Sequence, residues 1–142
     1  MRRSWTALEA ASAGFVAANI LHTLDHFRQG LDGLTWEILS AGTLLTIEAI
    51  VVLVLVLRRH EWAAPVAAVV GFSGAIGIAA AHIAPHWSAL SDSYPQIGAD
   101  ALSWIVMLVE MGAALVLGVV GARGVRRTAV VGPRLTVGNT RA

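Results

Sequence analysis

The stretch IVVLVLVLRRHEWAAPVAAVVGF, residues 50–72, places two apolar runs on either side of a short charged segment. A membrane-spanning helix needs roughly 20 predominantly apolar residues, and each run reaches about that length as it continues away from the charged segment. We therefore predict a helical hairpin with spans at about residues 34–57 and 62–86. Arg58 and Arg59 lie in the tight link between them.

One further apolar run lies on each side of this hairpin, at about residues 5–27 and 98–122. Only 13% of the 142 residues are charged, whereas about 25% are charged in a typical soluble domain. We expect an all-α polytopic membrane protein, a four-transmembrane-helix bundle within residues 1–122. Residues 123–142 are basic, contain Gly and Pro, and show no sustained period, which predicts a disordered cytoplasmic tail.

The first span could be mistaken for a cleaved signal sequence, because it has a basic start and an apolar stretch. Glu9 interrupts that stretch, and the segment ends in HTLDHF rather than in a small-residue cleavage site. We therefore interpret it as a permanent helix. The chain has no cysteine, which excludes disulfides and thiolate chemistry, and no lysine, which excludes Schiff-base chemistry.

The distribution of arginine predicts the orientation. Nine of the ten arginines fall on one side of the four spans, namely Arg2, Arg3, Arg58, Arg59, Arg123, Arg126, Arg127, Arg134 and Arg141. Basic loops remain in the cytoplasm, so we expect both termini to be cytoplasmic, in the inner membrane, with Arg28 alone outside. Tryptophans prefer the interfaces and agree, with Trp5 and Trp62 at inner ends and Trp36 and Trp87 at outer ends.

Small residues predict how the helices pack, because membrane helices associate where backbones approach closely. Four-residue stripes of small residues occur in three spans: Ala10, Gly14 and Ala18; Ser73, Gly77 and Ala81; Ala114, Gly118 and Ala122. Continued by fours, the first stripe reaches His22 and His26. We expect this face of the first span to pack against its neighbours and to carry both histidines into the bundle.

The ionisable residues of each span also lie on one helical seam. The seams are Glu37, Ala41, Leu44 and Glu48; Ala75, Ala79, His82 and His86; and Asp100, Ser103, Met107, Glu110 and Ala114. Titratable side chains that face lipid are costly, so these seams should face the bundle interior or a wet cavity. A four-helix bundle with a polar core follows.

Two histidine pairs at i and i+4 lie near the outer ends of two spans, His22 with His26 and His82 with His86. Neutral imidazole is a good ligand for zinc, copper, iron and nickel. The sequence therefore predicts a transition-metal site. Glu37 and Asp100 open their spans on the same side and are candidate further ligands, and Asp25 is a candidate partner that orients a ligating histidine.

Several other interpretations of this cluster stay open. One is a b-type haem with one axial histidine from the first span, one from the third, and Arg28 at a propionate. Others are a proton-titrating site without metal and structural hydrogen bonding. HTLDH, residues 22–26, matches an inverted zinc-protease motif only weakly, because Asp replaces Glu. His60 lies on the inner side and is interpreted as an interfacial anchor.

Two acids lie deeper in the membrane than the histidines. At about 1.5 Å of rise per residue, Glu48 is roughly 21 Å and Glu110 roughly 18 Å from the outer ends of their predicted spans. An acid at this depth is a candidate functional residue. We predict either a proton relay or a pair that bridges the second and fourth spans.

Pro85 and the outer loop are expected to affect the site. Pro85 has no backbone N–H, so it should free the carbonyl of Ala81, which can then serve a ligand. The loop SALSDSYPQIGAD, residues 88–100, is long for so compact a protein. With Asp92, Tyr94 and Pro95 it is a candidate cover for the histidines, and the alternative is a simple connector.

These patterns favour a small membrane protein that binds a transition-metal ion at its outer face, coupled through the deeper acids to cation or proton movement. The alternatives are the haem cytochrome and a non-enzymatic accessory subunit of a larger membrane complex. Whether the protein is an enzyme is left open. The expected partners are the lipid bilayer and either further copies of the chain or other subunits, and no nucleic acid is expected.

Overall fold

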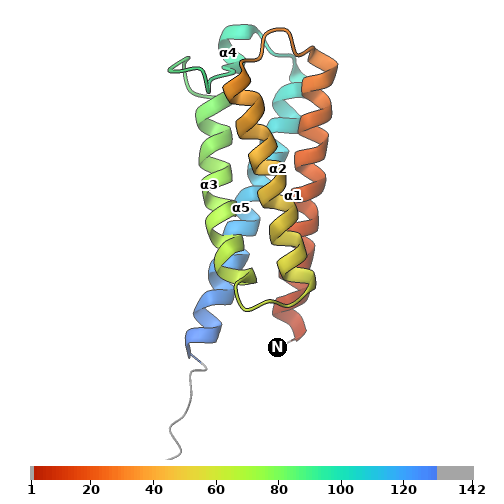
Figure 1. The fold of residues 1–142 in the computed structure, drawn as a ribbon, viewed down its shortest axis with the longest axis vertical. Coiled ribbons are helices and arrows are strands. Elements are labelled where there is room, and N and C mark those ends of the chain that lie inside the picture. Colours follow the sequence, from red (N-terminus) through yellow and green to blue (C-terminus); the bar gives the residue numbers. More distant parts are fainter. Residues whose placement is uncertain (1, 131–142) are drawn as a thin grey trace, which may run out of the picture.

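A computed structural model of the chain describes residues 2–130, and the side chains of residues 6–126. The described part is all-α, as predicted, and forms an elongated bundle with the N-terminus at one end and α4 at the other (Figure 1). The helices are α1 (Arg2–Gln29), α2 (Trp36–Leu57), α3 (Ala63–His82), the one-turn α4 (Tyr94–Ile97) and α5 (Ala101–Val130).

Four of these helices are long and apolar enough to cross a membrane: Thr6–Gln29, Trp36–Leu57, Ala63–His82 and Ala101–Arg126. Their outward faces carry large apolar side chains, and Ile76 and Val69 are 70% and 68% exposed. Apolar surface of this extent is expected where a helix contacts lipid. The fold indicates a multi-pass membrane protein, in agreement with the composition.

Two predicted helix ends are wrong. α3 ends at His82 rather than at residue 86, because Pro85 disfavours the helical conformation at Ala84 before it and cannot donate a helical hydrogen bond. α5 continues to Val130, so residues 123–130 are helical where a disordered tail was predicted. Alanine and arginine favour helix. The rest of that tail, 131–142, lies outside the described residues.

Glycines bring α3 and α5 into close contact. A Cβ atom at Gly71 would lie 2.3 Å from the backbone nitrogen of Gly118, and one at Gly121 would lie 2.5 Å from that of Ala68. The predicted stripe on α5 therefore includes a true contact residue, Gly118. On α3 the predicted face is displaced, because Gly77 has no heavy atom within 4 Å of an added Cβ.

The packed face of α1 also differs from the predicted stripe. Ala10 and Gly14 are exposed, and of that stripe only Ala18 is buried. The buried face instead runs at three- and four-residue spacing through Leu8, Ser12, Phe15, Asn19, His22 and Asp25. Large apolar and polar side chains therefore share the space between α1 and its neighbours with small ones such as Ala11 and Ala18.

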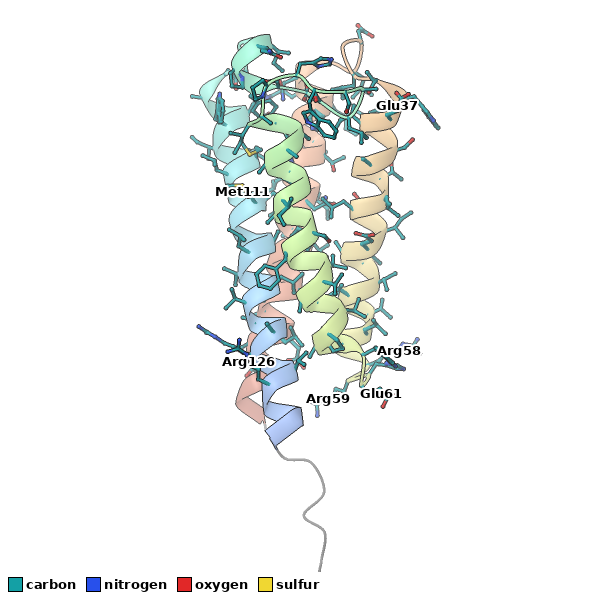
Figure 2. All side chains as sticks on the ribbon, turned by 90° about the vertical axis from the view of Figure 1, so that its left-hand side faces the viewer. Glu37, Arg58, Arg59, Glu61, Met111 and Arg126 are labelled. Carbon is teal, nitrogen blue, oxygen red and sulfur yellow. The ribbon has the colours of Figure 1, made fainter. Side chains whose placement is uncertain are left out.

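α2 is the least buried of the four long helices. Only 11% of its apolar window is buried, against 39% for α1. Its half next to the Arg58–Arg59 link packs into the core through Ala49, Val52 and Val56. From that link towards Glu37, α2 and α3 diverge (Figure 2).

Candidate metal centre

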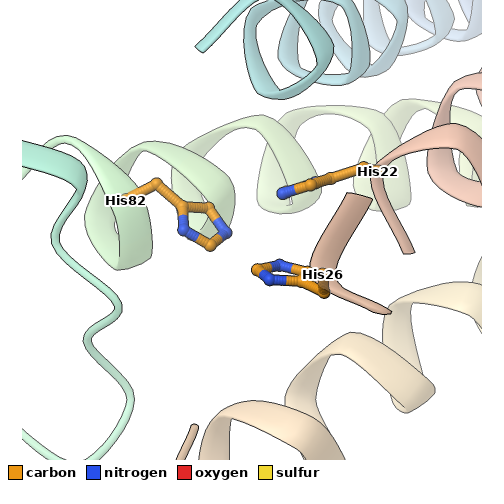
Figure 3. A group of neighbouring side chains, drawn as sticks. All are labelled: His22, His26 and His82. Carbon is orange, nitrogen blue, oxygen red and sulfur yellow. The ribbon is translucent and has the colours of Figure 1, made fainter. Parts of the chain in front are cut away.

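Three of the predicted histidines come together at the end of the bundle that carries α4. His22 and His26 lie one turn apart on α1, and His82 is the last residue of α3. One ligand nitrogen from each lies within 4.8 Å of the others, and the three rings point into a common space (Figure 3). His22 and His82 are buried and His26 is half-buried.

His22 is held by groups at both ring nitrogens. Its Nδ1 contacts a carboxylate oxygen of Glu110, which is 1% exposed, and its Nε2 lies 3.1 Å from the Tyr94 hydroxyl. In the tautomer whose Nδ1–H donates to the Glu110 carboxylate, the neutral imidazole keeps its lone pair on Nε2. A histidine–carboxylate pair of this kind orients metal-binding histidines in many proteins.

Asp92 holds the other two histidines. The Nδ1 atom of His82 lies 3.2 Å from the Asp92 carbonyl oxygen and 3.5 Å from its Oδ2. The Nδ1 atom of His26 lies 3.8 Å from the same Oδ2. The Nδ1–H of His82 donates to this carbonyl. In a neutral imidazole the other ring nitrogen, Nε2, then carries the lone pair. Both His22 and His82 therefore present the nitrogen that a metal requires.

The loop after α3 is fixed by the backbone carbonyl that Pro85 frees. The backbone N–H of Asp92 donates to the Ala81 carbonyl at 2.9 Å, so this oxygen anchors the loop rather than serving a ligand. Ser91, Asp92, Ser93 and Tyr94 are all buried, and Asp92 and Tyr94 contact the histidines, so this loop is more than a connector. Burial raises the pKa of the Tyr94 hydroxyl. Tyr94 therefore stays protonated and donates a hydrogen bond to Nε2 of His22.

A chain of hydrogen bonds continues from His22 to α2. Asn19 Nδ2 donates to the second carboxylate oxygen of Glu110 at 2.8 Å, and Thr46 Oγ1 donates to Asn19 Oδ1 at 2.8 Å. Each step crosses between helices, from α2 to α1 to α5 and back to α1. Sequence reasoning missed Asn19 and Thr46. Asn19 lies three residues before His22, and a polar residue at that spacing shares its face.

The structure does not bring His86, Glu37 or Asp25 into the histidine group. His86 is exposed beyond the end of α3, and its backbone N–H donates to Gln96 Oε1 at 3.1 Å. Glu37 is exposed on the first turn of α2 (Figure 2). Asp25 is buried, but its carboxylate accepts from Arg28 at 2.7 Å and from Gln29 at 2.8 Å rather than from a histidine.

The structure places Asp100 at the start of α5 and not in the histidine group. It lies directly before α5, and its Oδ1 accepts from the Ser103 backbone N–H at 2.9 Å, which satisfies a free donor of the first turn. The hydrogen bond from Ser103 and the nearby Arg28 guanidinium lower the pKa of Asp100 to about 2. Arg28 also contacts Asp25, so it joins α1 to the start of α5.

The two deeper acids do not form one layer. α5 begins at Ala101, so Glu110 lies about 14 Å below its start, while His22 lies about 10 Å below the end of α1. This small difference lets Glu110 reach His22. Glu48 contacts neither: it is half-buried and makes no hydrogen bond or ion pair to another described residue.

A cavity of about 480 Å³ adjoins the histidines. Side chains of α1, α2 and α3 form most of its wall, and His22, His26, His82, Glu48 and Glu110 all contribute to its lining. The remaining lining is mostly apolar. The site therefore combines a group of imidazoles with space for a further molecule.

Comparisons of the chain with protein-family models, with curated proteins and with solved structures found no match.

Proposed function

We propose that the protein binds one transition-metal ion through His22, His26 and His82, at the outer face of the cytoplasmic membrane. The observation that carries this proposal is the approach of three imidazoles from two helices to within 4.8 Å. Among the described residues this is the group of metal-ligating side chains that lies close enough together to hold an ion. Imidazole nitrogens suit zinc, copper and iron.

The spacing of the nitrogens fits a small ion after a modest closure. Metal–nitrogen bonds of about 2.0–2.1 Å in tetrahedral geometry place the nitrogens roughly 3.4 Å apart. Rotations of the side chains close the difference from 4.8 Å. Three histidine ligands leave a fourth position open, which is the arrangement of catalytic rather than structural zinc sites.

The surroundings of the histidines support the same proposal. Glu110 contacts Nδ1 of His22, and the Asp92 carbonyl accepts from Nδ1 of His82, which leaves the Nε2 atom of each ring as the candidate ligand. Partners of this kind fix the tautomer and raise the basicity of a ligating imidazole. Tyr94 donates to Nε2 of His22, and it must release this nitrogen when an ion binds.

A haem between two axial histidines is the alternative occupant, and the presence of a third histidine in the group favours a single ion over it. With metal–nitrogen bonds of about 2 Å, two axial rings stand roughly 6 Å apart, centroid to centroid, with the macrocycle between them. The centroids of His22 and His82 are 4.9 Å apart, and those of His26 and His82 are 5.5 Å apart. His22 and His26 also stack at 4.7 Å, so one ion shared by three rings is the more economical occupant.

Coupling to proton movement is the second part of the proposal. The chain Thr46–Asn19–Glu110–His22 connects the ion site to the depth of the membrane through hydrogen bonds. Glu110 contacts His22 directly and is the titratable member of the chain, so it can take up or release a proton when the ion binds, whereas the Asn19 amide only holds Glu110 in place. Glu48 is not joined to this chain, so we assign the relay to Glu110 alone.

Metal titration of the purified protein tests the proposal. Chelator-treated protein in detergent should bind one Zn²⁺, Cu²⁺ or Co²⁺ per chain, measured by elemental analysis after desalting. His22→Ala and His82→Ala should each weaken binding at least a hundredfold. His86→Ala and His60→Ala are matched controls that should leave it unchanged. Equal weakening in His86→Ala, or none in His22→Ala, would overturn the three-histidine site.

A further inference from the structure

The cavity beside the histidines is large enough for an organic molecule. Its volume is about 480 Å³, within the roughly 300–1,000 Å³ typical of small-molecule sites. A single hydrated ion does not account for this space. The cavity extends from the histidines down to Glu48, between α1, α2 and α3.

The cavity opens sideways between α2 and α3. Gly42 on α2 and Gly77 on α3 both line it, both are exposed, and a Cβ at either would meet no heavy atom within 4 Å. One turn lower, a Cβ at Gly74 would lie 3.2 Å from Leu45 Cδ1, so there the two helices are in contact. Both glycines lie within candidate membrane spans, and the opening therefore faces lipid.

The end of the cavity nearest the water is covered. Leu31, Leu34, Trp87 and Leu90 from the two connecting loops line it there. The Thr35 hydroxyl, just before α2, donates to the Ala89 carbonyl and ties these loops together. A molecule therefore reaches the cavity from the bilayer rather than from the water.

The polar groups of the lining define the head group of the occupant. Glu48 has no hydrogen-bond partner among the described residues, and a carboxyl group at membrane depth requires one. A hydroxyl or carbonyl group on the occupant satisfies it, whichever protonation state Glu48 adopts. An anionic head is disfavoured, because Glu48 and Glu110 both line the cavity.

We infer that this cavity binds a neutral, lipid-soluble molecule with a hydroxyl or carbonyl head, the chemistry of quinones, quinols and long-chain alcohols. The molecule passes between α2 and α3, and its head lies between Glu48 and the histidines. This inference deepens the proposed function, since the same three histidines line the cavity. It rests on the proposed function for one point only, the position of the head group beside the ion.

The test uses the full chain in nanodiscs, with and without Zn²⁺, titrated with decyl-benzoquinone. Trp87 lines the cavity, so a bound quinone should quench it with a saturable component that Trp87→Phe removes. Gly42→Leu and Gly77→Leu, which fill the opening, should weaken saturable binding at least tenfold. Gly14→Leu makes the same change at an exposed glycine of α1 that also has open space, and it should have no effect.

Two further comparisons check the head group. Glu48→Leu should weaken binding at least tenfold while Glu48→Gln retains it, and dodecanol should displace the quinone at least tenfold better than dodecanoate. The absence of a saturable component, equal weakening in Gly14→Leu, or equal displacement by dodecanoate would overturn the inference. Gly42→Leu leaves every histidine in place, so its affinity for Zn²⁺ tests the ion site separately. Normal Zn²⁺ binding with weakened quinone binding supports both proposals, and no Zn²⁺ binding in either the parent protein or Gly42→Leu overturns the ion site alone.

Discussion

Both ring nitrogens of His22 contact groups that belong to other helices than α1. Glu110 on α5 accepts from one ring nitrogen, Tyr94 on α4 lies at the other, and the His26 ring stacks on it. Glu110 also accepts from Asn19. The orientation of one imidazole therefore depends on two further helices.

Removing the carboxylate of Glu110 should lower metal affinity, whereas removing that of Glu48 should not. Glu110→Gln keeps the size of the side chain but replaces an oxygen that binds His22 or Asn19 with an amide donor. We expect metal affinity to fall by about 10–100-fold, the range seen when such partners are removed. Glu48→Gln is the matched control and should leave metal affinity unchanged in a competition titration. Unchanged affinity in Glu110→Gln would show that His22 needs no carboxylate.

Three histidines of the proposed metal centre could be predicted from the sequence, and the carboxylates that contact them could not. The four-residue spacing of His22 and His26 fixes a shared face on α1, and His82 follows from matching depth. His86 does not join the histidines, because α3 ends before Pro85 and His86 no longer continues its helical face. Asp92 lies in a loop, where no period relates a residue to a helix face, and the contact of Glu110 with His22 depends on where α5 begins. Both contacts depend on tertiary structure, which the spacing of residues along one helix does not determine.

At the scale of the element, α5 depends on contacts at both its start and its middle. Asp100 accepts from the backbone of its first turn, and Gly118 and Gly121 let α3 approach its backbone. The stripes of small residues in the sequence indicated that such a contact exists. They did not identify its face, because α3 carries small residues on more than one side.

The α3–α5 contact should be sensitive to a single methyl group. Gly71→Ala places a Cβ 2.3 Å from the Gly118 nitrogen, so the helices must separate, and overpacking of this kind costs about 1–3 kcal/mol. The thermal midpoint in detergent should fall. Gly77→Ala introduces the same methyl group on the same helix into open space and should leave the midpoint unchanged or higher. Similar midpoints for the two variants would contradict the packing.

The start of α5 should respond to pH. The folded pKa of Asp100 is about 2, below the ordinary 3.8, so its contribution to stability is fully present above about pH 4 and is lost as pH falls towards 2. Asp100→Ala should therefore lower the midpoint of thermal unfolding at pH 6. The difference from the parent protein should shrink at pH 2. Metal affinity at pH 7 should not change, whereas a ligand role for Asp100 would require it to fall.

At the scale of the whole molecule, four apolar runs predicted four spanning helices, and α1, α2, α3 and α5 are long and apolar enough to cross a membrane. Length and hydropathy suffice for this, because a helix that crosses a bilayer must satisfy its own backbone. The side on which each end lies is carried by arginine positions alone and stays a prediction.

A topology measurement tests that orientation. A reporter inserted at Gly33, an exposed position in the loop between α1 and α2, should be found outside the cytoplasm. The same reporter fused after Ala142 should be found inside, because the arginines near this end favour the cytoplasmic side. Both reporters on one side, or the reverse arrangement, would move the histidines away from the outer face.

The loose packing of α2 separates the two proposed ligands. The three histidines of the proposed ion site belong to α1 and α3, whereas α2 forms one side of the opening to lipid. An outward movement of α2 about its packed half near Val52 and Val56 would leave the imidazoles in place, but it would have to break the hydrogen bonds of Thr35 with Ala89 and of Thr46 with Asn19. We therefore expect the organic molecule to exchange more often than the ion, with the ion as the fixed component and the lipid-borne molecule as the one that turns over.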